Sequence, residues 1–307
     1  MNTVTRTPRP GKARPDTYQI ITDRIVSLLE SGVVPWRQPW TGDGEPRNLS
    51  SGKAYRGVNT FLLGCSSYSS CYWLTYKQAR ERGGHVRKGE RGTPVVFWKW
   101  FKTGDKATDA ETTTETTPDK RPPCMVRYYT VFNVTQCDGL EYPTPETRDT
   151  SATIPACEAI VDNMPHRPTI DHGGDRACYA PITDVVSMPD RARFNSDETY
   201  YETLFHELTH STAHKTRCAR KSESKDWHPF GSQDYSKEEL VAEIGSAYLC
   251  NISGIVDRTI DSSAAYIAGW LKRLRDDKRC VITAAAQAQK ASDYILDVAP
   301  HDKGGAV

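Results

Sequence analysis

The chain lacks several features that would assign it to a membrane or secreted class. No run of about 18 apolar residues is present to form a membrane-spanning helix. The N-terminus, MNTVTRTPRPGKARP, has basic residues but no apolar stretch after them, so it does not fit a secretory signal. The nine cysteines form no CxxC pair and no zinc-finger spacing, and their odd number argues against a disulfide framework. These absences predict a protein of the reducing cytoplasm with no membrane partner.

The chain carries its charge unevenly. Its 307 residues have a formal net charge of only +1. Residues 1–140, however, hold 21 Lys and Arg against 13 Asp and Glu, and the remainder holds 19 against 26. Five of the N-terminal acids lie in the Thr-rich stretch 103–120, whose composition predicts a disordered insertion. The rest of the N-terminal region is strongly basic, which favours a polyanionic partner.

Hydrophobic periodicity predicts an α+β protein of two domains. We expect an N-terminal α+β domain over 16–140, a Pro- and Thr-rich linker over 141–153, and a mostly helical C-terminal domain with a small sheet over 154–298. The N-terminal domain is expected to contain helices at 16–31 and 75–82 and a hairpin of strands 93–101 and 125–134. The C-terminal domain is expected to contain a strand at 182–188 and helices at 154–163, 197–214, 236–253, 261–276 and 279–297.

The segment FHELTH at 205–210 contains the pattern H-E-x-x-H. Histidines four residues apart on a helix lie on one face, so His206 and His210 can bind one metal ion while Glu207 acts as general base. Asn195, Ser196 or Asp197 can cap this helix, and no Pro or Gly interrupts it through His214. His214 continues the series by one turn and is expected to lie beyond the ion. The alternative interpretation is that the two histidines are ordinary solvated residues of a helix.

A second predicted helix, YSKEELVAEIGSAYL at 235–249, offers a third ligand, because Glu239 and Glu243 lie four residues apart on one face. The arrangement resembles the gluzincin-like peptidases. That resemblance implies Glu239 as the third ligand and Glu243 as the acid that hydrogen-bonds a ligating histidine. The reverse assignment stays open, and Glu238 is a further option for the third ligand.

Two imidazoles and one carboxylate leave an open fourth position on Zn²⁺, which is the pattern of catalytic zinc sites. Glu207 would take a proton from a water there, and the implied reaction is peptide hydrolysis. The same ligands accept Mn²⁺ or another divalent metal. A centre that binds metal without catalysis fits the sequence as well.

The N-terminal region places cations beside aromatic residues. Because unpaired bases stack on aromatic rings while Lys and Arg follow the phosphates, the mixture favours single-stranded nucleic acid. Trp36 and Trp40 each follow a proline, Pro35 or Pro39, that holds them in an extended segment, and they are expected to be more available than core residues. The competing interpretation is that these aromatics form a core and the cations a solvated surface. The candidate DNA-binding residues are Trp36, Arg37, Trp40, Tyr55, Arg56, Trp73, Lys77, Arg87, Lys88, Arg91, Trp98 and Trp100.

Taken together, the two halves resemble the ArdC-type antirestriction proteins of conjugative plasmids. The resemblance is carried by IVSLLESGVVPWRQPW, AYRGVN, WLTYKQARERGGHVRKGERGTPVVFW, YTVFNVTQCDGL, YYETLFHELTHSTAH, FGS, YSKEELVAEIGSAYL and YIAGWLKRLRDDKR, and it extends over about residues 18–297. It implies an N-terminal domain that binds single-stranded DNA, shared with TraC-type primases, and a C-terminal zincin-like metallopeptidase domain. The family often has Trp after the second metal histidine where this chain has Ser211, a difference that concerns substrate preference more than metal binding.

The resemblance implies an antirestriction protein that protects incoming plasmid DNA from host restriction during conjugation, and we expect no priming activity. Two alternatives remain at this level. The chain is either a metalloprotease that cleaves a host protein, such as a restriction enzyme, or a DNA-binding shield with a vestigial metal site.

Overall fold

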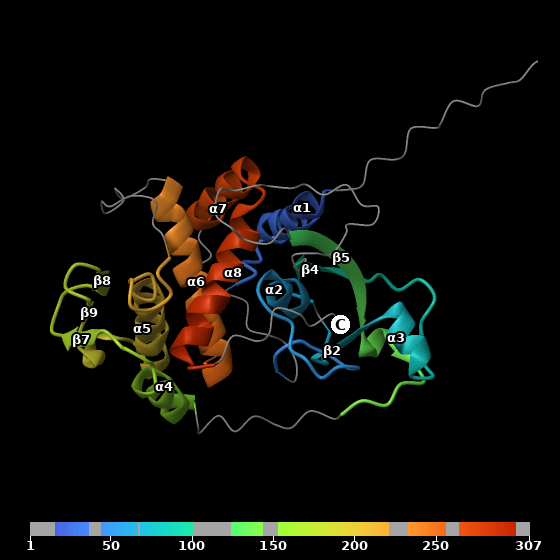
Figure 1. Ribbon diagram of the computed structural model, residues 1–307, viewed down its shortest axis with the longest axis horizontal. Helices are drawn as coiled ribbons and strands as arrows, with labels where there is room; N and C mark the ends of the chain where they lie inside the picture. The colour runs from blue at the N-terminus through green and yellow to red at the C-terminus, as the bar shows by residue number, and fades with distance from the viewer. Residues whose placement is uncertain are drawn as a thin grey trace, which may run out of the picture.

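The computed structural model describes residues 16–36, 44–66, 68–100, 124–143, 153–220, 233–255 and 264–298. Over these ranges the chain is an α+β protein, as the sequence predicts, and most of its helices lie between separate sheets (Figure 1). The predicted insertion at 103–120 and most of the predicted linker lie outside the described residues.

The N-terminal half is built on a four-stranded sheet of order β1-β2-β5-β4. Its strands are β1 (Arg47–Asn48), β2 (Tyr72–Thr75), β4 (Thr93–Trp100) and β5 (Cys124–Asn133). β4 and β5 pair antiparallel from Thr93↔Val131 to Trp100↔Cys124, which confirms the predicted hairpin. A short antiparallel pair, β3 (His85–Val86) with β6 (Cys137–Asp138), lies beside it.

Two short helices pack against this sheet. α3 (Tyr76–Glu81) begins at the predicted capping box, in which Thr75 accepts from the backbone of Gln78 and the Gln78 side chain accepts from the backbone of Thr75. α2 (Val58–Gly64) lies at the outer edge of β4, where the Asn59 amide bonds both the N–H and the C=O of Val96 at 2.7 Å. That contact satisfies backbone groups that an edge strand otherwise leaves unpaired.

The C-terminal half combines helices with a small mixed sheet, as predicted. The sheet has the order β7-β9-β8 and consists of β7 (Thr169–His172), β8 (Cys178–Ala180) and β9 (Val185–Met188). The helices are α4 (Thr153–Asp162), α5 (Asp197–Ser211), α6 (Gln233–Ser253), α7 (Ala264–Asp276) and α8 (Cys280–Ile295). The packed pairs α5–α6 and α6–α8 position the functional side chains described below.

The two halves share one hydrophobic core. Helix α1 (Thr17–Glu30), α2 and Trp36 pack against α6, α7 and α8 in a single buried cluster. Phe61 stacks on Tyr248 with ring centroids 5.1 Å apart, and the Trp36 ring meets the Trp270 ring edge-on at 5.7 Å. Because large apolar surfaces of each half are buried only by the other, we expect the halves to depend on each other for stability.

Among the described residues, no helix is both long and apolar enough to cross a bilayer.

Candidate metal centre

Helix α5 carries the H-E-x-x-H pattern. It begins at Ser196, whose hydroxyl accepts from the Thr199 N–H, and it ends at Ser211. One face, including Leu204, Phe205 and Leu208, is fully buried in the core, so the orientation of the helix is fixed. The helix is therefore present as predicted but stops three residues before the predicted end at His214.

His206 and His210 lie one turn apart and bring their Nε2 atoms to 3.1 Å of each other. Glu239 on α6 lies opposite, with Oε2 3.6 Å from His206 Nε2 and Oε1 3.5 Å from His210 Nε2. An ion with bonds of about 2.1 Å in tetrahedral geometry separates its ligand atoms by about 3.4 Å. The donor set and its spacing therefore fit one divalent cation, and among the described residues these three form the one such group.

A close approach of two helices places Glu239 beside the histidines. A Cβ added to Gly245 on α6 would lie 2.4 Å from Thr209 Cγ2 and 2.7 Å from Thr209 Oγ1 on α5. Only glycine fits there without displacing Thr209, which is itself fully buried. Sequence reasoning missed Gly245, because a glycine inside a helical pattern gives no sign of what lies across from it.

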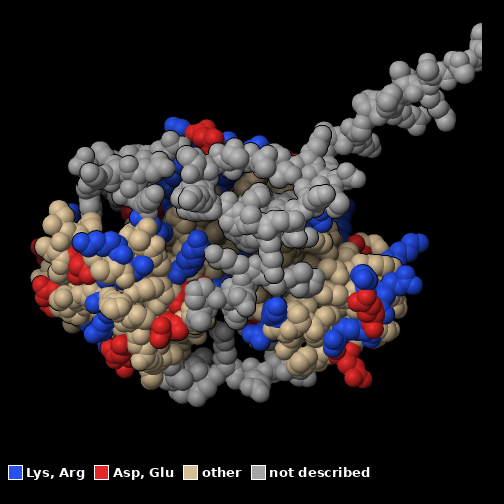
Figure 2. Space-filling model, in the orientation of Figure 1, with Lys and Arg blue, Asp and Glu red and all other residues tan. Residues whose placement is uncertain are grey.

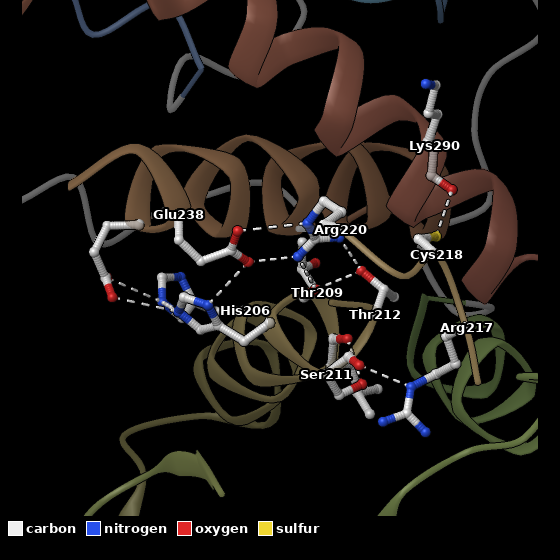
Figure 3. Close-up of polar contacts among 12 residues, drawn as sticks. His206, Thr209, Ser211, Thr212, Arg217, Cys218, Arg220, Glu238 and Lys290 are labelled. Carbon is white, nitrogen blue, oxygen red and sulfur yellow. Dashed lines mark hydrogen bonds and ion pairs between the residues drawn. The ribbon is translucent and has the colours of Figure 1, made fainter. Parts of the chain in front are cut away.

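A second carboxylate supports the histidine side of the centre. Glu238 Oε1 lies 3.6 Å from Nδ1 of His210, the ring nitrogen that faces away from the ligand position. Arg220 holds Glu238 through an ion pair of 2.5 Å and also donates to the Thr209 backbone oxygen at 3.0 Å (Figure 3). An acceptor on the far nitrogen of a ligating histidine fixes its tautomer and orientation. Glu238 is therefore positioned beside the far nitrogen of His210.

Glu243 is half-buried on α6. Its predicted role as the acid that hydrogen-bonds a ligating histidine stays a prediction. The assignment of Glu239, rather than Glu238, as the third metal ligand also stays a prediction. His214 lies past the end of α5 and its Nδ1 contacts Thr216 Oγ1 at 2.7 Å, outside the group of three.

The charged groups of this cluster change one another's pKa values. Burial lowers the pKa of His210, but hydrogen bonds to Glu238 and Glu239 outweigh burial and raise the pKa to about 10. Burial raises the pKa of Glu239, but hydrogen bonds from His206 and His210 outweigh it and hold that pKa well below its usual range. Without an ion, the centre thus keeps a proton that a metal must displace.

The candidate DNA-binding rings in the N-terminal half are mostly buried. Trp36, Tyr55 and Trp73 are 1%, 4% and 1% exposed, so the expectation that Trp36 is more available than a core residue is wrong. Each ring fills a hydrophobic cluster, where it buries more apolar surface than a position facing water would allow. For these three rings the structure favours the core interpretation.

The candidate cations divide into two groups. Arg56 is ion-paired with Asp293 of α8 at the junction of the two halves. Lys77, Arg87, Lys88 and Arg91 are exposed, and Figure 2 shows Lys and Arg side chains, mixed with acidic ones, at the end of the molecule where α3 lies. Arg37 and Trp40, and the side chains of Trp98 and Trp100, lie outside the described residues.

Two family models match the chain. One, described as the N-terminal domain of anti-restriction factor ArdC, matches residues 15–132, and the other, described as zincin-like metallopeptidase, matches residues 155–287. The chain is also 38% identical to the antirestriction ArdC protein of plasmid R388, for which crystal structures exist with Mn(II) bound and without metal. The Mn(II)-bound structure aligns with a TM-score of 0.70 over 94% of this chain and 99% of that one.

Curated relatives extend the comparison. Two DNA primases TraC from Escherichia coli are 38% and 37% identical over 294 residues. The alignments cover 91% of this chain but 20% and 27% of the primases, so the chain spans about a quarter or less of their length. The uncharacterized protein y4eC of Sinorhizobium fredii is 36% identical, with 94% of each chain covered.

Proposed function

Because the chain belongs to the family of ArdC antirestriction proteins, we propose that it binds single-stranded DNA and protects incoming plasmid DNA from host restriction during conjugation. We further propose that its C-terminal half holds a divalent metal ion, Zn²⁺ or Mn²⁺, in a peptidase-like centre. The site of action would be the cytoplasm of the recipient cell, where the entering strand first meets restriction enzymes.

The metal proposal depends chiefly on one observation, the spacing of the three donor atoms. His206, His210 and Glu239 lie at 3.1–3.6 Å from one another, close to the roughly 3.4 Å that a tetrahedral ion requires. The Mn(II) bound to the R388 protein supports a divalent ion in this family. The ligand types also suit Zn²⁺, which is why the identity of the ion is part of the proposal.

The residues around the donors suit hydrolysis of a peptide bond. A divalent ion in such a site polarises a carbonyl and lowers the pKa of a water molecule. We assign Glu207, which follows His206 on α5 and is 8% exposed, to accept the proton and pass it to the leaving amine. Glu238 and Arg220 keep the His210 ring in one orientation.

The DNA proposal is supported by the charge of the N-terminal half and by the relatives that share it. Residues 1–140 carry 21 Lys and Arg against 13 Asp and Glu, and the chain aligns with DNA primases over both halves. A basic region of this kind attracts phosphates at moderate salt.

A conjugation assay tests the proposal. An unmodified plasmid is transferred into a restricting host with and without the chain, and surviving transconjugants are counted. We expect the full-length protein to raise survival, and an unchanged count would contradict the proposed function. Because the halves share a core, full-length variants are the appropriate comparison rather than fragments.

The variant Glu207→Gln separates protection by DNA binding from protection by proteolysis. The intact donor set and the buried Glu207 favour an active peptidase as the second candidate function. Loss of protection in this variant, with DNA binding retained, would identify cleavage of a host protein as the protective step. Full protection would show that covering the DNA suffices.

A further inference from the structure

An aromatic row crosses one face of the N-terminal sheet. The Phe97 ring on β4 meets the Tyr129 ring on β5 edge-on with centroids 5.2 Å apart, and Tyr55 lies behind Phe97 at 6.5 Å. Phe97 is partly buried, whereas Tyr129 is 45% exposed. An exposed tyrosine ring in a strand leaves apolar surface in contact with water. The ring of Tyr129 packs against the partly buried ring of Phe97.

The strand register adds a cation to the same face. Phe97 pairs with Arg127, and Val95 pairs with Tyr129, so Arg127 and Tyr129 project to the side on which Phe97 lies. Arg127 is exposed. It therefore lies next to the Phe97 and Tyr129 pair and can contact a phosphate while a base contacts a ring.

The row continues toward the other end of the sheet. Tyr68 is partly buried and packs edge-on against Trp73 at 5.6 Å, on the same side as Val131 and Val95. Burial raises the pKa of Tyr68, the Glu90 carboxylate raises it further and the Arg87 guanidinium lowers it, so both charges lie near this ring. From Arg127 to Asn133, the partner of Trp73, the row is about 20 Å long at about 3.3 Å per residue.

The opposite face of the sheet differs. There Ala79 of α3 packs with Leu49, Leu74 and Val134 in a separate buried cluster. Tyr128, the neighbour of Tyr129 on β5, projects to that side and is 40% exposed. Its cross-strand partner is Val96, which belongs to the core shared by the two halves.

We propose that the surface formed by Tyr68, Phe97, Tyr129 and Arg127, hereafter the aromatic face, is where single-stranded DNA binds. This inference rests on the proposed function and specifies its location. The buried Tyr55 and Trp73 lie beneath the rings of this face, and Arg127 adds a cation at one end. Separated bases stack on the rings, and the DNA backbone runs along β5 from Arg127 toward Tyr68. A duplex cannot offer its base faces in this way, so the face selects single strands.

The neighbouring tyrosines of β5 provide a matched test. Binding of a fluorescent oligothymidine of about 20 nucleotides, longer than usual site sizes, is measured by anisotropy with full-length protein. We expect Tyr129→Ala to weaken binding about tenfold and Tyr128→Ala to leave it within a factor of about two, because only Tyr129 belongs to the aromatic face. Equal effects of the two changes, or no effect of either, would overturn the inference. Thermal unfolding of both variants checks that each is folded, and Phe97→Leu repeats the test with apolar bulk retained.

The arginine is tested by its salt dependence. Arg127→Ala is expected to reduce the slope of log affinity against log salt by about 0.7, the contribution of one phosphate contact to a single strand. Arg80→Ala, on α3 at the opposite face, is the control and should leave the slope unchanged. If Arg80→Ala lowers the slope while Arg127→Ala does not, the DNA strand follows the other face. Wild-type protein that binds no oligothymidine would instead contradict the proposed function itself, so the two failures are distinguishable.

Discussion

The metal centre and the aromatic face are held together in different ways. In the centre, three donors from two helices converge on one point, and Gly245, Glu238 and Arg220 fix their positions. On the aromatic face, rings from several segments lie in a row. Strand register positions Phe97 and Tyr129, and Tyr68, in the loop before β2, packs against Trp73. The convergent site is therefore expected to lose its function when one member is removed, whereas the row is expected to weaken in steps.

The largest effect is expected from removing a ligand. His206→Ala should lower metal affinity about a thousandfold, because it removes roughly a third of a binding free energy of about 10–16 kcal/mol. His214→Ala, one turn beyond His210, should leave affinity unchanged. Titration calorimetry with Zn²⁺ and with Mn²⁺ measures both variants. Equal losses in the two would mean that the third histidine belongs to the centre.

The next effect is a dependence of metal affinity on pH. Without metal, the pKa of His210 is raised from the ordinary 6.5 to about 10. Charged His210 therefore stabilises the metal-free fold fully below pH 6.5, and this stabilisation is lost progressively as the pH rises toward 10. A metal displaces that proton, so affinity should rise about tenfold per pH unit between about pH 6.5 and 9. Competition with a chelator of known pH dependence measures this, and a flat profile would show that His210 is neutral without metal.

A smaller effect distinguishes the two supporting carboxylates. Glu238→Gln should reduce metal affinity about 10- to 100-fold, the usual effect of losing a partner of a ligating histidine. Glu243→Gln is the matched control on the same helix and should change affinity less. The opposite order would restore Glu243 to the role that the family resemblance implied.

The smallest effect concerns the helix contact itself. Gly245→Ala should lower the free energy of unfolding by about 1–3 kcal/mol, because the added methyl overlaps Thr209. Gly269→Ala in α7, where an added Cβ meets nothing within 4 Å, should instead stabilise the protein by up to about 1 kcal/mol. Urea unfolding measures both. Similar values would mean that α5 and α6 separate easily.

Local patterns accounted for much of the fold. The capping box at Thr75 and Gln78, the β4–β5 hairpin and the long helices α1, α5, α6 and α8 occur where periodicity and turn residues predict them. Helix α2 and the short strands β1, β2, β3, β6, β7 and β8 were not predicted. The sequence of α2, VNTFLLG, is buried all round, so it has no polar face that would reveal a helical period.

In the candidate metal centre, too, some features follow from local sequence and others do not. His206 and His210 share a face because a helix repeats every 3.6 residues, and the sequence alone specifies that. The place of Glu238 beside His210, and the part played by Arg220, depend on where α6 and the segment after α5 meet. Nothing in the spacing of those residues along the chain fixes that meeting point.

By itself, the sequence determined the helix that carries the two histidines and Glu207, the hairpin of the N-terminal sheet and the basic character of that half, since each depends on residues close together in the chain. Only the tertiary structure decided which aromatic rings are buried and which face solvent, and which carboxylate supports His210. Burial and cross-helix contacts depend on segments far apart in the chain. Trp36 is therefore buried against Trp270, whereas Tyr129 is exposed at the aromatic face.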